Sequence, residues 1–274
     1  MTTWQLITST WHWHPSVLLG CAALAGAYAV ALRFRWSNAE PWFAAGILVL
    51  LFALLSPVHT LGDGYLFSAH MLQHLLLLLI VPPLLLLGLP PALIAEARRW
   101  SAWRRAERVL GQPVVAWLIG IGAMWAWHLP ALYNATLWDT GIHITEHLCF
   151  LVSATIFWWP VVVPPARPHS APFATLLYLF AAMAASSVLG MLLTFTPPGL
   201  YPAYLHPVDR LGILPLLRDG WGLTPAADQQ LGGLLMWIPG SLVYLGAMMI
   251  TLVRWYSAPE EDAVSPLSFV KRET

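Results

Sequence analysis

Two pairs of histidines stand out because each pair lies within a strongly apolar stretch. They are His70 with His74, and His143 with His147. The i, i+4 spacing places both imidazoles of a pair on one face of a helix, about 6 Å apart along its axis. Imidazole is the commonest metal ligand in proteins, and an ionisable side chain inside a membrane is costly. The spacing therefore predicts a metal site between two facing transmembrane helices.

Further groups able to bind a metal are expected at a similar depth. His128 ends one apolar segment, Glu146 lies within the second histidine motif, and Met236 lies near the start of the last apolar segment. Imidazole with thioether suits Cu(I), whereas imidazole with carboxylate suits Cu(II) or zinc. These three residues are predicted as supporting or alternate ligands, and the residue types leave the metal open.

The composition is that of a protein embedded in a membrane. Of its 274 residues, 58% are hydrophobic and 9% are charged, and the mean hydropathy is +0.67. Soluble proteins carry about 25% charged residues, so this chain has too few charges to cover a soluble surface. The net charge is zero, which gives no indication of nucleic-acid binding. We expect an all-α, polytopic membrane protein in contact with the lipid bilayer.

Seven apolar segments have the length of a membrane-spanning helix, about 17–25 residues. We therefore expect one seven-helix transmembrane domain over residues 1–257, followed by a polar cytoplasmic tail over 258–274. The expected spans are 16–34, 40–57, 65–88, 112–128, 143–163, 172–194 and 231–253.

The positions of the basic residues predict the orientation. With seven spans, all thirteen Lys and Arg residues except Arg210 and Arg218 fall on one side. The side rich in Lys and Arg faces the cytoplasm, so the N-terminus is expected outside and the C-terminus inside. Every histidine except His169 then lies outside or in the outer half of a span. Four of these, which we expect to be ordinary interfacial residues, are His12, His14, His59 and His206.

The longest connection between spans, from Phe195 to Gln230, is rich in proline and glycine. It lies on the outer side in this topology. We expect it to pack as a cap over the outer face of the bundle.

Four motifs resemble the CtaG family of membrane-integral cytochrome c oxidase assembly factors. They are Phe67–Leu76, Trp127–Tyr133, His143–Trp159 and Asp228–Trp237. The resemblance implies a non-enzymatic protein of the bacterial inner membrane that matures a haem–copper oxidase. It would take copper from periplasmic donors and help it reach the catalytic subunit of the oxidase. Such a metallochaperone needs an exchangeable copper site near the periplasmic face.

Three other functions remain open from the residues. The order His143–x–x–Glu146–His147 matches H-x-x-E-H zinc peptidases, in which the glutamate acts as general base. Histidines on neighbouring helices also suit the axial positions of a haem, although a single haem would leave two of the four unexplained. A copper permease is disfavoured because the inner halves of the spans are almost purely apolar.

Overall fold

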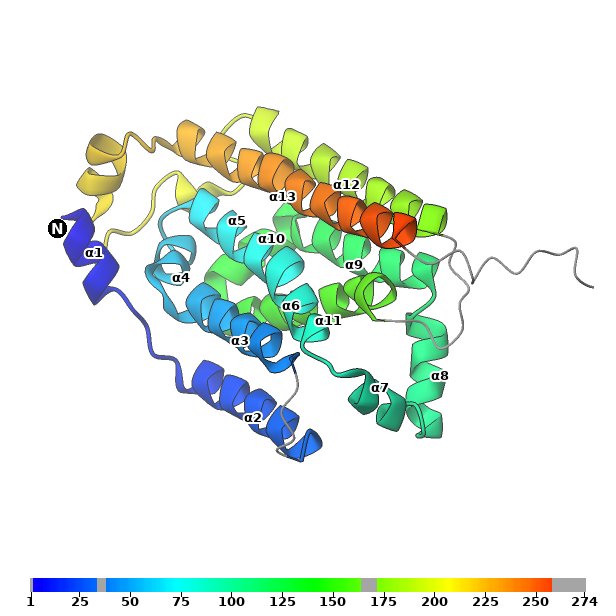
Figure 1. Cartoon of the computed structure of the whole chain (residues 1–274). Helices are drawn as coiled ribbons and strands as arrows, with labels where there is room; N and C mark the ends of the chain where they lie inside the picture. The colour runs from blue at the N-terminus through cyan, green and yellow to red at the C-terminus, as the bar shows by residue number, and fades with distance from the viewer. Residues whose placement is uncertain (1, 34–37, 164–171, 258–274) are drawn as a thin grey trace, which may run out of the picture.

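The computed structural model describes residues 2–33, 38–163 and 172–257, and Figure 1 shows the whole chain. Within these ranges the regular structure is entirely helical, which confirms the predicted all-α class. The cytoplasmic tail predicted over 258–274 lies outside the described residues.

The first half of the described chain contains short helices that the sequence did not predict, together with the first three expected spans. Its elements are α1 (Thr3–Ser9), α2 (Pro15–Ala31), α3 (Glu40–Leu55), α4 (Pro57–Gly62), α5 (Phe67–Leu75), η1 (Leu76–Ile80), α6 (Val81–Leu87), α7 (Pro91–Ala97) and α8 (Ser101–Leu110). The second half contains α9 (Pro113–Trp127), α10 (Pro130–Trp138), α11 (Thr140–Val162), α12 (Pro172–Phe195), η2 (Pro202–Tyr204), η3 (Leu216–Gly220) and α13 (Pro225–Tyr256).

Four helical stretches are long and apolar enough to cross a membrane: α5 through α6, α11, α12 and α13. A fifth candidate is the pair α8 and α9, which passes the same test together but bends by 72° at its break. Helices α2 and α3 are apolar and shorter, with 17 and 16 residues. The protein is therefore a helical membrane protein with four or five candidate spans, and the seven-span topology stays a prediction.

The stretch from α5 to α6 remains helical through two consecutive prolines. Pro82 and Pro83 lack the backbone N–H that an α-helix interior needs. The chain forms a π-helical turn at η1, directly before them, and then continues as α6 to Leu87. π-Helix is rare and occurs mostly as single turns of this kind inside α-helices. The third expected span is thereby one continuous helical rod, with its histidines at the N-terminal end.

Helices α12 and α13 lie side by side across one face of the bundle (Figure 1). Glycines permit their close approach: a Cβ atom added to Gly190 of α12 would lie 2.7 Å from the backbone nitrogen of Trp237. One added to Gly233 of α13 would meet the backbone nitrogen and hydroxyl of Thr194. Small residues at such positions let membrane helices pack backbone against backbone.

The bundle has two chemically different ends. Helices α1 and α4 and the connection between α12 and α13 lie at one end, and α7 and α8 lie at the other (Figure 1). None of the residues of α8 is buried. The α7–α8 end carries the basic residues Arg98, Arg99, Arg104, Arg105 and Arg108. The histidines described below occupy the opposite end. This separation agrees with the charge asymmetry in the sequence, although the orientation in the membrane stays a prediction.

An ion pair fixes α8 against its neighbours at the basic end. Arg98 Nη2 lies 2.6 Å from Glu107 Oε1, and Trp159 Nε1 donates to the same oxygen over 3.2 Å. The hydrogen bond from Arg98 holds the pKa of Glu107 below its ordinary value of 4.5. The folded state therefore favours the charged carboxylate.

We expect this pair to stabilise the protein above pH 4.5, with the contribution lost as the pH falls through the lowered folded-state pKa of Glu107. The measurement is the melting temperature of wild type and Glu107→Gln in lipid nanodiscs between pH 7 and pH 3. The difference in melting temperature between wild type and Glu107→Gln should be largest near neutral pH and should disappear in acid. A difference that is constant across this range would contradict the assignment.

Candidate metal centre

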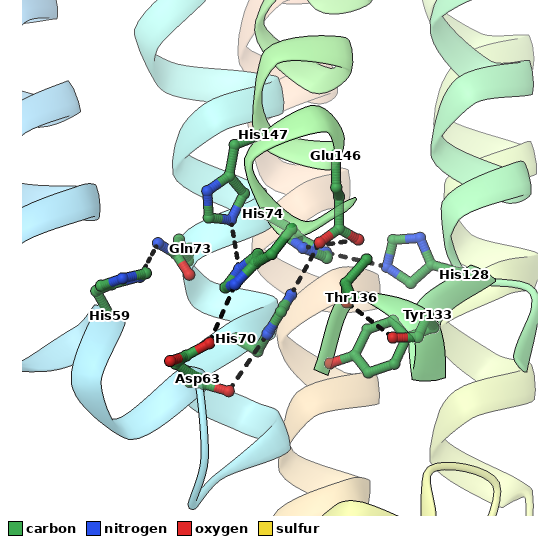
Figure 2. A network of polar contacts seen from close by, with 12 residues as sticks. His59, Asp63, His70, Gln73, His74, His128, Tyr133, Thr136, Glu146 and His147 are labelled. Carbon is green, nitrogen blue, oxygen red and sulfur yellow. Dashed lines mark hydrogen bonds and ion pairs between the residues drawn. The ribbon is translucent and has the colours of Figure 1, made fainter. Parts of the chain in front are cut away.

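Four side chains from two helices converge at one point, three of them buried and one half-buried. His70 and His74 come from α5, and Glu146 and His147 come from α11. Each offers one ligand atom, and the four atoms all lie within 4.8 Å of one another. Figure 2 shows these four residues pointing toward one another between the two helices. The structure thus brings together one residue pair from each predicted histidine motif, which we call the His/Glu cluster.

The N-termini of both helices are held by carboxylates. Asp228 of α13 accepts hydrogen bonds from the backbone nitrogens of Phe67 and Ser68, over 2.8 Å and 3.0 Å. Asp139 accepts one from the backbone nitrogen of Ile142, over 2.9 Å. The first turns of a helix leave N–H groups without partners, and these carboxylates satisfy them. The caps set where α5 and α11 begin, and so fix the depth at which the two histidine motifs meet.

Hydrogen bonds assign the tautomers of His70 and His74. A carbonyl oxygen can only accept, so Met124 O, 2.6 Å from His128 Nδ1, places a proton on that nitrogen. Neutral His128 then accepts through Nε2 from His74 Nδ1, 3.4 Å away. In the same way Gly62 O, 3.3 Å from His70 Nδ1, places the proton of His70 there. In the neutral form, both cluster imidazoles therefore turn an Nε2 lone pair toward Glu146.

These inward-facing atoms lack hydrogen-bond partners among the residues that the structure describes. They are His70 Nε2, His74 Nε2 and both carboxylate oxygens of Glu146, and all four are buried. The N···O separations are 3.5 Å for His70 with Oε2 and 3.5 Å for His74 with Oε1, which is long for a charged hydrogen bond. Lone pairs facing an anionic carboxylate repel unless a cation lies between them. The arrangement therefore suits a bound cation.

Two N···O distances in the cluster approach those of a transition-metal site, whereas the four ligand atoms together lie within 4.8 Å of one another and would draw closer around an ion. Two ligands at about 2.1 Å from one tetrahedral ion lie about 3.4 Å apart. The observed 3.5 Å separations are close to that value. Three imidazoles and one carboxylate form a donor set suited to zinc and copper.

His143 lies at the edge of the cluster. Its Nδ1 is 3.0 Å from Asp63 Oδ1, and its Nε2 is 3.1 Å from His147 Nε2. A carboxylate that binds the far nitrogen of a histidine orients the ring and increases its basicity. The hydrogen bond from His143 also holds the pKa of Asp63 below its usual range. In this geometry His143 supports His147, and its predicted role as a direct ligand stays a prediction.

His128 and Met236 also lie outside the four-residue group. His128 is buried, and its Nε2 contacts His74 Nδ1, the nitrogen of His74 that faces away from Glu146. The position of His128 therefore suits a supporting role. Met236 is buried in the apolar core, and no hydrogen bond or ring contact joins it to the cluster within the described ranges. Its role as an alternate ligand stays a prediction.

Several residues beside the cluster were not singled out from the sequence. Tyr204 Oη lies 3.2 Å from His70 Nδ1 and donates to Gly62 O over 2.8 Å. Tyr201 Oη donates to His128 O over 2.8 Å. Both tyrosines belong to the connection between α12 and α13, which therefore packs over the cluster as expected. Neither tyrosine has a spacing in the sequence that could have revealed its position.

His59 was expected to be an ordinary interfacial residue, but the structure places it beside the cluster. Its ring centroid lies 5.7 Å from that of His143 and 6.2 Å from that of His147. Gln73 Nε2 is 3.0 Å from His59 Nδ1 and donates to Ala53 O, which fixes the ring (Figure 2). Burial lowers the pKa of His59 to about 4, so the imidazole is neutral near pH 7.

The fold and the site together define a class: a helical membrane protein with a buried group of imidazoles and a carboxylate that suits a transition-metal ion. Residues 18–258 match the family described as "Cytochrome c oxidase caa3 assembly factor (Caa3_CtaG)". The chain belongs to this family, as the resemblance of its motifs implied.

Similar proteins occur in mycobacteria. "Uncharacterized protein ML1998" of Mycobacterium leprae is 25% identical over 271 residues, which cover 91% of this chain and 39% of that protein. "Uncharacterized protein Mb0105" of Mycobacterium bovis is 24% identical over 267 residues, with 89% and 39% covered. The chain therefore spans about two-fifths of the length of these relatives. No solved structure matches the chain.

Proposed function

We propose that this assembly factor binds a copper ion in transit at His70, His74, Glu146 and His147 and assists its delivery to the catalytic subunit of a haem–copper oxidase. The observation that carries the proposal is the set of buried nitrogen and oxygen atoms of His70, His74 and Glu146 that have no hydrogen-bond partner among the described residues. The family supports the connection with oxidase assembly. A centre made of side chains from two helices would release a cargo ion once its ligands are exchanged for those of a partner.

Copper is proposed ahead of zinc for two reasons. Copper(II) heads the order of affinity that nitrogen and oxygen sites show for divalent metals. A haem–copper oxidase, to which the ion would be delivered, needs copper at its active centre and does not use zinc there. Zinc remains the competing ion because the same donors suit it.

The proposed location is the bacterial inner membrane, with the histidine end of the bundle facing the periplasm. Support comes from the basic residues of α8 and of the segment between α7 and α8, which lie at the opposite end and would face the cytoplasm (Figure 1). The full proposal includes seven spans, periplasmic copper donors and an N-out, C-in topology. Cysteine labelling at introduced positions in α1 and α8, from either side of the membrane, would test it.

The position of Glu146 argues against the hydrolase that the H-x-x-E-H order suggested. Its two oxygens lie 3.5 Å from imidazole nitrogens of His70 and His74, so both face other candidate ligands. A general base instead needs an oxygen directed at a metal-bound water. A bis-histidine haem would use two imidazoles, and here a carboxylate lies between the candidate axial ligands.

The test is metal content after purification from copper-supplied cells. Wild type is expected to carry about one copper ion per chain, and the triple variant His70→Ala, His74→Ala, His147→Ala is expected to carry essentially none. His206→Ala is the matched control, because it removes an exposed imidazole from the α12–α13 connection. Copper retained in full by the triple variant would contradict the proposal, and zinc in place of copper would correct the metal.

A further inference from the structure

A line of histidines leads from the surface to the His/Glu cluster. His12 and His14 are exposed, His59 is half-buried, and His143 is buried with 5% of its surface exposed. Successive ring centroids lie 6.0 Å apart for His12 and His14, 5.6 Å for His14 and His59, and 5.7 Å for His59 and His143. The next ring, His147, belongs to the cluster and lies 4.3 Å from His143. The row thus runs from two exposed imidazoles through the half-buried His59 to the buried His143, and it ends at His147, which is half-buried.

The spacing of these rings is suited to handing on an ion. Two imidazoles that share one tetrahedral or linear metal ion place their ring centroids about 5–6.5 Å apart. The three outer steps all fall within this range. The spacing therefore allows neighbouring rings to share an ion at each of the three outer steps, so that the ion keeps a ligand as it moves inward. Asp63 adds a carboxylate beside His143, with 54% of its side chain exposed.

The segment that carries the outer two histidines is fixed to the bundle. The backbone nitrogen of His12 donates to Leu55 O at the end of α3 over 3.0 Å. Thr60 Oγ1 of α4 donates to Thr10 O over 2.8 Å, and this bond is buried. These contacts hold His14 over His59. The row of histidines is therefore part of the fold, although its members lie far apart in the sequence.

We propose that His12, His14 and His59 form an uptake path that passes a transition-metal ion from the aqueous surface to the buried cluster. The proposal rests on the metal-binding function proposed above and adds a separate role for residues outside the cluster. The path determines how fast the ion arrives, whereas the cluster determines how much is held. Rate and final occupancy therefore distinguish the two roles.

The experiment uses the full chain in lipid nanodiscs, stripped of metal and mixed with aqueous Cu(II) alone. Quenching of tryptophan fluorescence in a stopped-flow instrument gives the loading rate, and elemental analysis gives the final occupancy. We expect His12→Ala with His14→Ala to slow loading about tenfold, because charged or ligating groups at a site mouth raise arrival rates by about 10-fold to 1,000-fold. The final occupancy should equal that of wild type.

Two controls define the result. His206→Ala removes an exposed histidine outside the path and should load at the wild-type rate. Thr60→Val removes the anchor of the segment while keeping every histidine, and should also slow loading. A double histidine variant that loads at the wild-type rate to full occupancy would overturn the path alone. A lowered final occupancy in this variant would also overturn the path, because it would show that His12 and His14 belong to the site that holds the ion. Wild type that holds no copper would overturn both proposals.

Discussion

Glu146→Gln is expected to lower the copper affinity of the His/Glu cluster by at least about 100-fold, the upper end of what loss of a supporting group costs a metal site. Glu146 supplies the only carboxylate of the four converging residues. Glutamine keeps the size and shape of the side chain but removes its charge. Its amide N–H₂ could then donate to the Nε2 lone pair of His70 or His74, 3.5 Å from the present oxygens. The variant should fold normally and bind copper poorly.

The measurement is competition of the purified protein against a chelator of known copper affinity. Glu96→Gln is the matched control because Glu96 is an exposed acid at the basic end, paired with Arg99. Glu146→Asp should give an intermediate affinity, since aspartate keeps the negative charge but its carboxylate lies one methylene farther from the histidines. Wild-type affinity in Glu146→Gln would mean that the carboxylate is not a ligand. Cells with this variant should also assemble less active oxidase.

The sequence predicted the elements that carry the site because apolar length and i, i+4 histidine spacing are both local features of the chain. Apolar length predicted α12 almost to the residue, with 172–194 expected and Pro172–Phe195 found. The i, i+4 spacing predicted that each histidine motif would present one face. Those two regularities predicted that the His70 pair would face the His143 pair, and the four converging residues contain Glu146 in place of His143. The early start of α13, at Pro225 where 231 was expected, reflects a polar first turn that carries Asp228.

The rest of the site depends on contacts between distant parts of the chain. Asp63 reaches His143 across 80 positions, and Tyr204 reaches His70 across 134. His59 looked like an interfacial residue because α4, the short helix that carries it, has no apolar periodicity long enough to detect. Its place beside the cluster depends on α4 packing against α5. Propensity and hydropathy carry no information on such pairings.

The second large effect is expected from Gly190→Ala combined with Gly233→Ala, on the stability of the bundle. At Gly190 the added Cβ would lie 2.7 Å from Trp237 N and 2.9 Å from its Cα, and backbone atoms cannot rotate away. At Gly233 it would meet the backbone of Thr194. The helices must separate, and overpacking of this kind costs about 1–3 kcal/mol at each site. The double variant should therefore melt well below wild type.

Gly246→Ala separates this packing effect from the intrinsic effect of replacing glycine in a helix. Gly246 lies in the same helix, α13, and an added Cβ there meets no atom of another described element within 4 Å. Alanine favours a helix by about 0.5–1 kcal/mol over glycine, so this control should melt at or above the wild-type temperature. Separation of α12 from α13 also moves Asp228, which caps α5 through Phe67 and Ser68. Copper affinity should thus fall in the double variant and stay unchanged in Gly246→Ala. Equal melting temperatures for the double variant and Gly246→Ala would show that α12 and α13 are not in backbone contact.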